Sequence, residues 1–145
     1  MRLTAAPADA AARQRLLASV STLILDCDGV LWRGDTLLPG TAAALDAFRA
    51  AGKRLLFLTN NSSKSRRQYG AKFAALGLAV QPEEIVPTSY AAPAYLQSLG
   101  FAGTVFAIGN SGLHEELDAA GIRCGLGLGV LDCVCLQLLV GVRCR

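Results

Sequence analysis

Two carboxylates separated by one residue are the groups in this sequence best suited to do chemistry. Asp26 and Asp28 follow a short apolar run at residues 23–25, and Gly29 comes directly after them. Because side chains at positions i and i+2 of a strand point to the same face, both carboxylates can converge where the strand ends. Carboxylate oxygens at an open strand end suit a divalent cation and a phosphoryl group. The pair therefore predicts phosphoryl chemistry, with one acid as nucleophile and the other as proton donor.

Two simpler explanations compete with this one. A solvated turn accounts for the Asp-x-Asp-Gly string by itself, and the motif alone leaves that alternative open. A calcium loop needs further oxygen ligands at regular offsets and a closing Glu. Val30, Leu31 and Trp32 occupy the next positions, so the calcium loop is rejected.

A second polar segment follows the next apolar run. Residues 59–63 read Thr-Asn-Asn-Ser-Ser, directly after the apolar residues 53–58. The structural explanation is a hydrogen-bonded loop, because Asn favours tight turns. The chemical explanation is a phosphate cradle, built from the Thr59 hydroxyl, Asn60 and backbone N–H groups after Asp26. On the chemical hypothesis the catalytic and metal-binding residues are Asp26 and Asp28, and the substrate-binding residues are Thr59, Asn60, Asn61 and Gly29.

The elements that must position these residues alternate along the chain. Strands are expected at residues 22–25, 53–58, 85–86, 104–108 and 122–124, with a small hairpin at 30–38. Helices are expected at residues 9–20, 41–51, 65–76, 88–99 and 112–120. In the fourth helix, Thr88 or Ser89 is the expected cap, and Ala92, Tyr95, Leu96 and Leu99 the expected buried face.

Strands that alternate with helices at short loop distances predict an α/β fold, a doubly wound parallel sheet flanked by helices. Right-handed crossovers bring the loops that follow the strands to one edge of the sheet, where ligands bind. Asp26, Asp28, Thr59 and Asn60 all follow strands. We therefore expect these four side chains at the same edge.

Composition excludes several classes of protein. The 145 residues suffice for one domain, and the net charge of +3 is too small to indicate a nucleic-acid partner. Five cysteines form no pair of zinc-like motifs with the single histidine, which predicts reduced thiols and a cytoplasmic protein. The N-terminus has no apolar core of a signal peptide, and Asp9 argues against a mitochondrial transit peptide. The apolar stretch at 125–145 contains Asp132, Gln137 and many glycines, so we expect no membrane span.

The two motifs together support a family. Residues 26–34 (DCDGVLWRG), Pro39-Gly40, residues 52–54 (GKR) and residues 58–64 (LTNNSSK) resemble the haloacid dehalogenase (HAD) superfamily of phosphatases. Within it, the chain is similar to the phosphoglycolate phosphatase and pyridoxal phosphate phosphatase branch, from about Leu16 to Cys124. The resemblance implies a Rossmann-like core, Mg²⁺ and hydrolysis of small phosphomonoesters such as 2-phosphoglycolate through an aspartyl-phosphate. It implies Asp26 as nucleophile, Asp28 as acid and base, Thr59 as the second-motif hydroxyl and Asn60 as its substrate-positioning neighbour.

The sequence also departs from that family. The resemblance implies a later lysine and a later acidic pair that holds magnesium, but after Cys124 there is no lysine and the only acid is Asp132. We therefore expect an N-terminal helical segment at 1–20, the N-terminal part of a HAD-like core at 21–124 and an atypical apolar tail at 125–145. On this hypothesis the chain is a truncated or alternatively spliced product without a cap domain, and the full-length form is a homodimer. An inactive fragment that binds a partner, and a phosphotransferase or mutase of the same superfamily, remain open alternatives.

Overall fold

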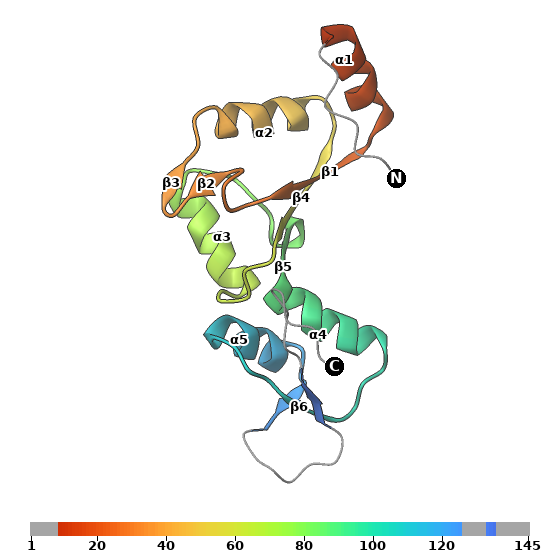
Figure 1. Cartoon of the computed structure of the whole chain (residues 1–145), viewed down its shortest axis with the longest axis vertical. Helices are drawn as coiled ribbons and strands as arrows, with labels where there is room; N and C mark the ends of the chain where they lie inside the picture. The colour runs from red at the N-terminus through yellow and green to blue at the C-terminus, as the bar shows by residue number, and fades with distance from the viewer. Residues whose placement is uncertain (1–8, 126–132, 136–145) are drawn as a thin grey trace, which may run out of the picture.

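The computed structural model describes residues 9–125 and 133–135, which form an elongated α/β chain with two parallel sheets (Figure 1). The helices are α1 (Ala10–Ser19), α2 (Thr41–Ala50), α3 (Arg66–Ala75), the 3₁₀ helix η1 (Pro82–Glu84), α4 (Thr88–Ser98) and α5 (Ser111–Ala119). The strands are β1 (Thr22–Asp26), β2 (Trp32–Arg33), β3 (Thr36–Leu37), β4 (Arg54–Thr59), β5 (Ile85–Pro87), β6 (Thr104–Phe106), β7 (Arg123–Cys124) and β8 (Cys133–Cys135).

The first sheet has the order β1-β4-β5, with all strands parallel. Its register places Asp26 opposite Leu58 and Thr59 opposite Pro87, so the polar residues that end β1 and β4 lie side by side. One face is buried against the helices, through Leu55 and Phe57. On the other face Ile24 is 65% exposed and Leu58 is 45% exposed. Parallel sheets are usually covered on both faces, and the described residues cover only one.

The hairpin of β2 and β3 lies at residues 32–37, as the sequence predicts. Its turn contains Gly34 with a φ of 57°, a left-handed conformation that glycine adopts without strain. Lys72 of α3 donates from Nζ to the Gly34 carbonyl oxygen at 2.8 Å. The hairpin is therefore fastened to α3.

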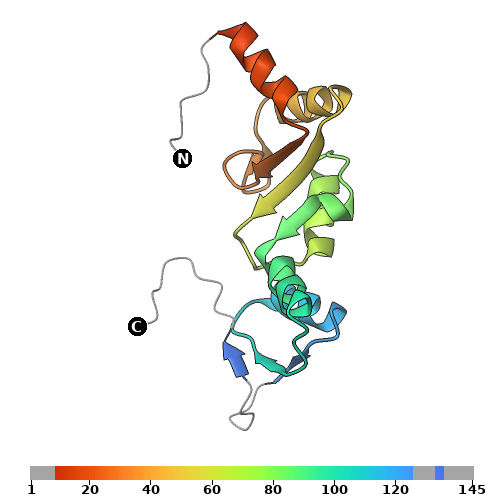
Figure 2. The same ribbon diagram turned by 90° about the vertical axis from the view of Figure 1, so that its right-hand side faces the viewer.

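The second sheet has the order β7-β6-β8 and is also parallel. It forms a separate hydrophobic cluster with α4 and α5, made of Ala92, Leu96, Val105, Ala107, Leu113, Leu117 and Ile122. The strands expected in one sheet are thus divided between two, since β6 pairs with β7 and β8 and not with β5. Figure 2 shows the arrows of β1, β4 and β5 pointing toward the half of the molecule that holds this second sheet.

Two expectations for the fourth helix are wrong. Tyr95 and Leu99 are 64% and 62% exposed, so only Ala92 and Leu96 of the expected face are buried. The N-cap is Pro87, and no side chain caps the helix. The hydroxyls of Thr88 and Ser89 instead donate to backbone carbonyls of the loop that follows β4, at Asn60 and Lys64.

The remaining helices follow the sequence closely. Asp9 caps α1 by accepting a hydrogen bond from the Ala11 backbone N–H at 3.0 Å, although the helix buries no residue. Ser65 caps α3 in a reciprocal capping box with Gln68. Within the described ranges, no helix has the length and apolarity needed to cross a membrane. The predictions for the tail at 125–145 fall outside the described residues, except for the backbone of β8 and Gly125.

Candidate active site

A tight loop after β1 positions the two acids. The loop turns at Gly29, whose φ is 83°, and its Gly29 N–H donates to the Trp32 carbonyl oxygen at 2.7 Å. Asp26 and Asp28 are exposed, whereas Cys27 between them is 1% exposed. The alternation expected from strand geometry therefore extends past the end of β1.

Asp28 is held at both carboxylate oxygens. The Trp32 indole Nε1–H donates to Oδ1 at 2.8 Å, and the Thr59 hydroxyl donates to Oδ2 at 3.5 Å. Thr59 itself is 1% exposed at the end of β4. The expected approach of the second motif to the first is thus present in the structure.

Asp26 has a different environment. Its Oδ1 accepts the N–H of the next residue, Cys27, at 2.8 Å, and Oδ2 accepts no hydrogen bond from the residues described. The side chain lines an open cavity of about 420 Å³ together with Ile24, Leu58 and Asn60. Asp26 is therefore the acid with a free oxygen and room for a ligand, and Asn60 stands at the same opening.

The loop after β4 is an ordered, hydrogen-bonded structure. The Asn61 N–H donates to the Thr59 hydroxyl at 3.2 Å, and the Asn61 side-chain oxygen accepts the Ser63 N–H at 2.9 Å. The backbone carbonyl of Asn61 also accepts a hydrogen bond from the Tyr69 hydroxyl at 3.3 Å. The side-chain oxygen of Asn61 thus stabilises the loop. Contact of Asn61, Asn60 or Gly29 with a substrate stays a prediction.

Two residues that the sequence singled out only as candidate helix caps hold this loop from outside. The Thr88 hydroxyl donates to the Asn60 carbonyl at 3.0 Å, and the Ser89 hydroxyl donates to the Lys64 carbonyl at 2.6 Å. Trp32 belongs to the first motif, but its type suits both packing and hydrogen bonding. Only the tertiary structure shows that it does both.

Burial sets the protonation of two groups beside the acids. It raises the pKa of the Cys27 thiol to about 12, and the negative charges of Asp26 and Asp28 add to the effect. Burial also raises the pKa of Tyr69, opposed by a hydrogen bond with Thr59. Cys27 is therefore a protonated core residue and not a nucleophile.

The acids fit a magnesium ion in part. Carboxylate oxygens are the hard ligands that Mg²⁺ prefers, and Mg²⁺ is usually bound by one or two carboxylates together with waters and phosphate oxygens. Asp26 offers a free oxygen for such a role. Among the described residues, no cluster of three or more His, Cys, Asp or Glu side chains forms a metal site.

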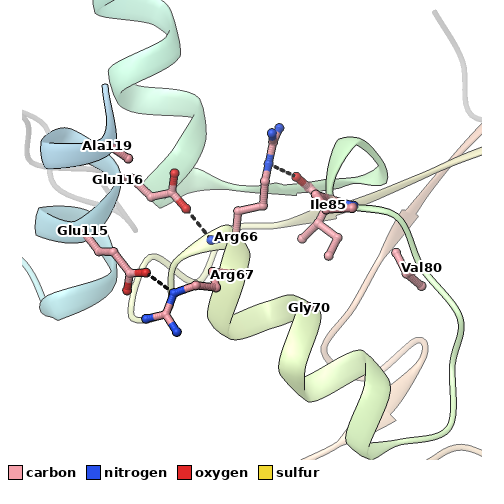
Figure 3. A pocket seen from close by; sticks show the side chains of 9 residues that line it. Arg66, Arg67, Gly70, Val80, Ile85, Glu115, Glu116 and Ala119 are labelled. Atoms are coloured by element: carbon pink, nitrogen blue, oxygen red, sulfur yellow. Dashed lines mark hydrogen bonds and ion pairs between the residues drawn. The ribbon is translucent and has the colours of Figure 1, made fainter. Parts of the chain in front are cut away.

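A second cavity, of about 430 Å³, lies between α3 and α5 and does not include the acids (Figure 3). Its charged side chains bind one another or nearby backbone groups. Arg67 Nε lies 2.6 Å from Glu115 Oε1, Glu116 accepts the backbone N–H of Arg66, and Arg66 Nε donates to the Ile85 carbonyl at 3.0 Å. We interpret this cavity as a junction between the two halves of the molecule.

Comparison with known proteins places these features in a family. The family model described as haloacid dehalogenase-like hydrolase matches residues 23–123. Phosphoglycolate phosphatase 1A, chloroplastic, of Arabidopsis thaliana is 54% identical over 75% of this chain and 31% of its own length. Glycerol-3-phosphate phosphatase of Mus musculus is 46% identical over 80% of this chain and 39% of its own length. The chain thus spans about a third of the length of these relatives.

Solved structures show the same fold. A p-nitrophenyl phosphatase from Archaeoglobus fulgidus has a TM-score of 0.67 at 32% identity, covering 72% of this chain and 40% of that one. A glycerol phosphate phosphatase from Mycobacterium tuberculosis, solved in complex with magnesium, has a TM-score of 0.64 at 28% identity, covering 75% and 33%. With paired acids, a facing threonine and a family match across most of its described residues, this chain belongs to the haloacid dehalogenase-like hydrolases.

Proposed function

We propose that this chain carries the phosphoryl-accepting half of a Mg²⁺-dependent phosphatase for small phosphomonoesters of the 2-phosphoglycolate type. The observation that carries the proposal is the convergence of Asp26, Asp28 and Thr59 at one sheet edge, with Asp26 facing an open cavity. The names of the relatives, phosphoglycolate phosphatase and glycerol-3-phosphate phosphatase, support the substrate class.

The chemistry divides between the two acids. The free carboxylate oxygen of Asp26 attacks phosphorus, a P–O bond forms to Asp26, and the P–O bond to the alcohol breaks. Asp28 gives its proton to the departing alcohol oxygen. Asp28 then accepts a proton from water as the water oxygen attacks phosphorus, the bond to Asp26 breaks, and inorganic phosphate leaves.

The remaining groups bind and orient the phosphoryl group. Thr59 and Asn60 supply polar groups from the end of β4. The Asp28 N–H supplies a donor from the first motif, since the N–H groups of Cys27 and Gly29 donate to Asp26 and Trp32. Asp26 and Asp28 would hold a magnesium ion, which would offset the negative charge of the phosphoryl oxygens.

The test is hydrolysis of 4-nitrophenyl phosphate by the purified chain, with and without Mg²⁺. Asp26→Asn removes the nucleophile and should abolish Mg²⁺-dependent turnover. Asp46→Asn is the matched control, because Asp46 is an exposed aspartate on α2. Equal turnover in the Asp26→Asn variant and the unmodified chain would exclude Asp26 as nucleophile. Product analysis separates hydrolysis from phosphotransfer, since a transferase yields a phosphorylated acceptor instead of free phosphate.

A second candidate function is phosphate binding without turnover. It is favoured by the absence of a cluster of three or more metal-binding side chains among the described residues. On this hypothesis the chain is a regulatory or binding isoform, and calorimetry should detect inorganic phosphate binding in Mg²⁺ while hydrolysis stays at background. Robust turnover that Asp26→Asn abolishes would overturn it.

The partner and location predictions complete the proposal. They comprise a small phosphorylated metabolite, no nucleic acid, no membrane, a cytoplasmic location and a homodimer in the full-length form. Two Arabidopsis thaliana relatives carry the word chloroplastic in their names, so organelle fractionation is the relevant check on location. Light scattering measures the oligomeric state.

A further inference from the structure

Trp32 combines complete burial with a hydrogen bond to a candidate catalytic acid. Its relative exposure is 0%, and its one polar atom, Nε1, donates to Asp28 Oδ1 at 2.8 Å. A buried N–H without an acceptor is costly, so burial of the ring requires this partner. The same bond restrains the carboxylate that accepts it.

Two residues of α3 hold the indole ring. The Phe73 ring meets it edge-on, with ring centroids 4.9 Å apart and an interplanar angle of 76°. The Lys72 ammonium lies 4.7 Å from the ring centroid, and also donates to the Gly34 carbonyl of the hairpin turn at 2.8 Å. Helix α3 and the hairpin therefore fix the direction of the indole N–H.

The two bonds to Asp28 are unequal. The Trp32 contact at 2.8 Å lies at the short end of the usual range for N–H···O hydrogen bonds, whereas the Thr59 contact at 3.5 Å is at the limit of a hydrogen bond. Asp26 has no comparable restraint, because its donor is the backbone of the adjacent residue. Trp32 is thus the main group that orients Asp28.

We propose that Trp32 is a positioning residue that fixes the orientation of the Asp28 carboxyl group toward the substrate, an inference that rests on the phosphatase function proposed above. An indole N–H only donates, so it holds Oδ1 as its acceptor and leaves Oδ2 on the side of Thr59. Without the indole N–H, the long Thr59 contact alone restrains the carboxyl group, which then rotates away from the leaving alcohol oxygen.

A first experiment measures the contact without any turnover. Trp32 is the only tryptophan, so the protein gives one indole N–H signal in a ¹H–¹⁵N NMR spectrum. Asp28→Ala should move that signal and speed its exchange with solvent deuterium on the order of tenfold, because the indole N–H loses its acceptor. Asp26→Ala is the matched control, two residues away, and should leave exchange unchanged. Equal exchange in the Asp28→Ala variant and the unmodified chain would overturn the proposal.

A second experiment separates positioning from general structural support. Trp32→Phe keeps an aromatic ring at this position, although a smaller one, and deletes the indole N–H. An alkyl phosphate such as 2-phosphoglycolate needs a proton on its leaving group, whereas 4-nitrophenolate leaves without one. Trp32→Phe should therefore lower kcat for the alkyl ester about ten- to a hundredfold more than for the aryl ester, with little change in KM. Phe73→Leu disturbs the ring's packing but keeps the N–H, and should affect both esters alike.

The two hypotheses fail in different ways. Absence of turnover in the unmodified chain would count against the phosphatase function, and the indole experiment would still decide whether Trp32 restrains Asp28. Equal loss of both esters in Trp32→Phe would assign Trp32 a purely structural role and overturn its positioning function.

Discussion

Gly112 of α5 lies against the backbone of Lys64, so close that a Cβ on Gly112 would stand 2.3 Å from the Lys64 carbonyl carbon. Lys64 belongs to the loop that starts at Thr59 and Asn60. The same loop receives the Ser89 hydroxyl at the Lys64 carbonyl. The second half of the molecule therefore packs directly on the loop of the candidate site, and only a residue without a side chain permits this approach.

Replacement of Gly112 tests that contact. Gly112→Ala should lower the free energy of unfolding by about 1–3 kcal/mol, because backbone must move to admit the methyl group. Gly70→Ala is the control, since Gly70 is also helical and its added Cβ would meet only Ile85 Cδ1 at 3.9 Å. That variant should gain up to about 1 kcal/mol from helix propensity. Urea unfolding followed by circular dichroism measures the free energy of unfolding of both variants. An equal change in the two variants would show that the close approach of Gly112 to Lys64 does not affect stability.

The hydroxyl of Thr59 serves both structure and chemistry. It accepts the Asn61 N–H and donates to Asp28. Thr59→Val keeps the shape but removes the hydroxyl, and should lower the free energy of unfolding by about 1–3 kcal/mol because the hydrogen bonds to the Asn61 N–H and to Asp28 are both lost. Thr59→Ser keeps the hydroxyl and loses one buried methyl, worth about 0.8 kcal/mol. If Thr59 binds the phosphoryl group, Thr59→Ser should retain phosphate binding in calorimetry and Thr59→Val should not. The opposite order would count against that role.

The Arg67–Glu115 pair should weaken in acid. A hydrogen bond from Arg67 lowers the pKa of Glu115 below its ordinary value of 4.5. A lowered pKa in the folded state means that the pair stabilises the fold above about pH 4.5, and that this contribution disappears as pH falls through the folded pKa. The difference in free energy of unfolding between the unmodified chain and Glu115→Gln should therefore be larger at pH 7 than at pH 3. Glu83→Gln, at an exposed glutamate of η1, should show no such trend. Added salt should reduce the effect, because both side chains are accessible to solvent.

Cys27 should resist alkylation in the folded protein. Iodoacetamide reacts with the thiolate, and burial raises the pKa of this thiol to about 12, so at pH 8 only about one molecule in ten thousand carries the thiolate. Peptide mass spectrometry should find Cys27 unmodified in buffer and modified in urea. Cys124, which is half-buried, is the internal comparison and should react first. Rapid labelling of Cys27 in buffer would mean that the loop after β1 opens readily.

Several elements could be predicted because their signals are local. The Asp9 cap, the Ser65 capping box and the hairpin around Gly34 depend on residues within a few positions of one another. The alternation of Asp26, Cys27 and Asp28 between solvent and core also follows from strand geometry alone. The buried face of α4 could not be predicted in this way, because the partner that covers it comes from β6 and α5, far along the chain.

The sequence by itself determined the residue types of the candidate site, the two strands that end in them and the family to which the chain belongs. The tertiary structure decided which strands pair and which groups the side chains of the site contact. It divided the strands between two sheets, turned Thr88 and Ser89 toward the loop after β4 and aimed the Trp32 indole at Asp28. The physical reason is separation along the chain. Hydrophobic periodicity and helix capping depend on residues within one or two turns of one another. Strand pairing and the direction of a buried N–H, by contrast, depend on contacts between segments that only the complete packing brings together.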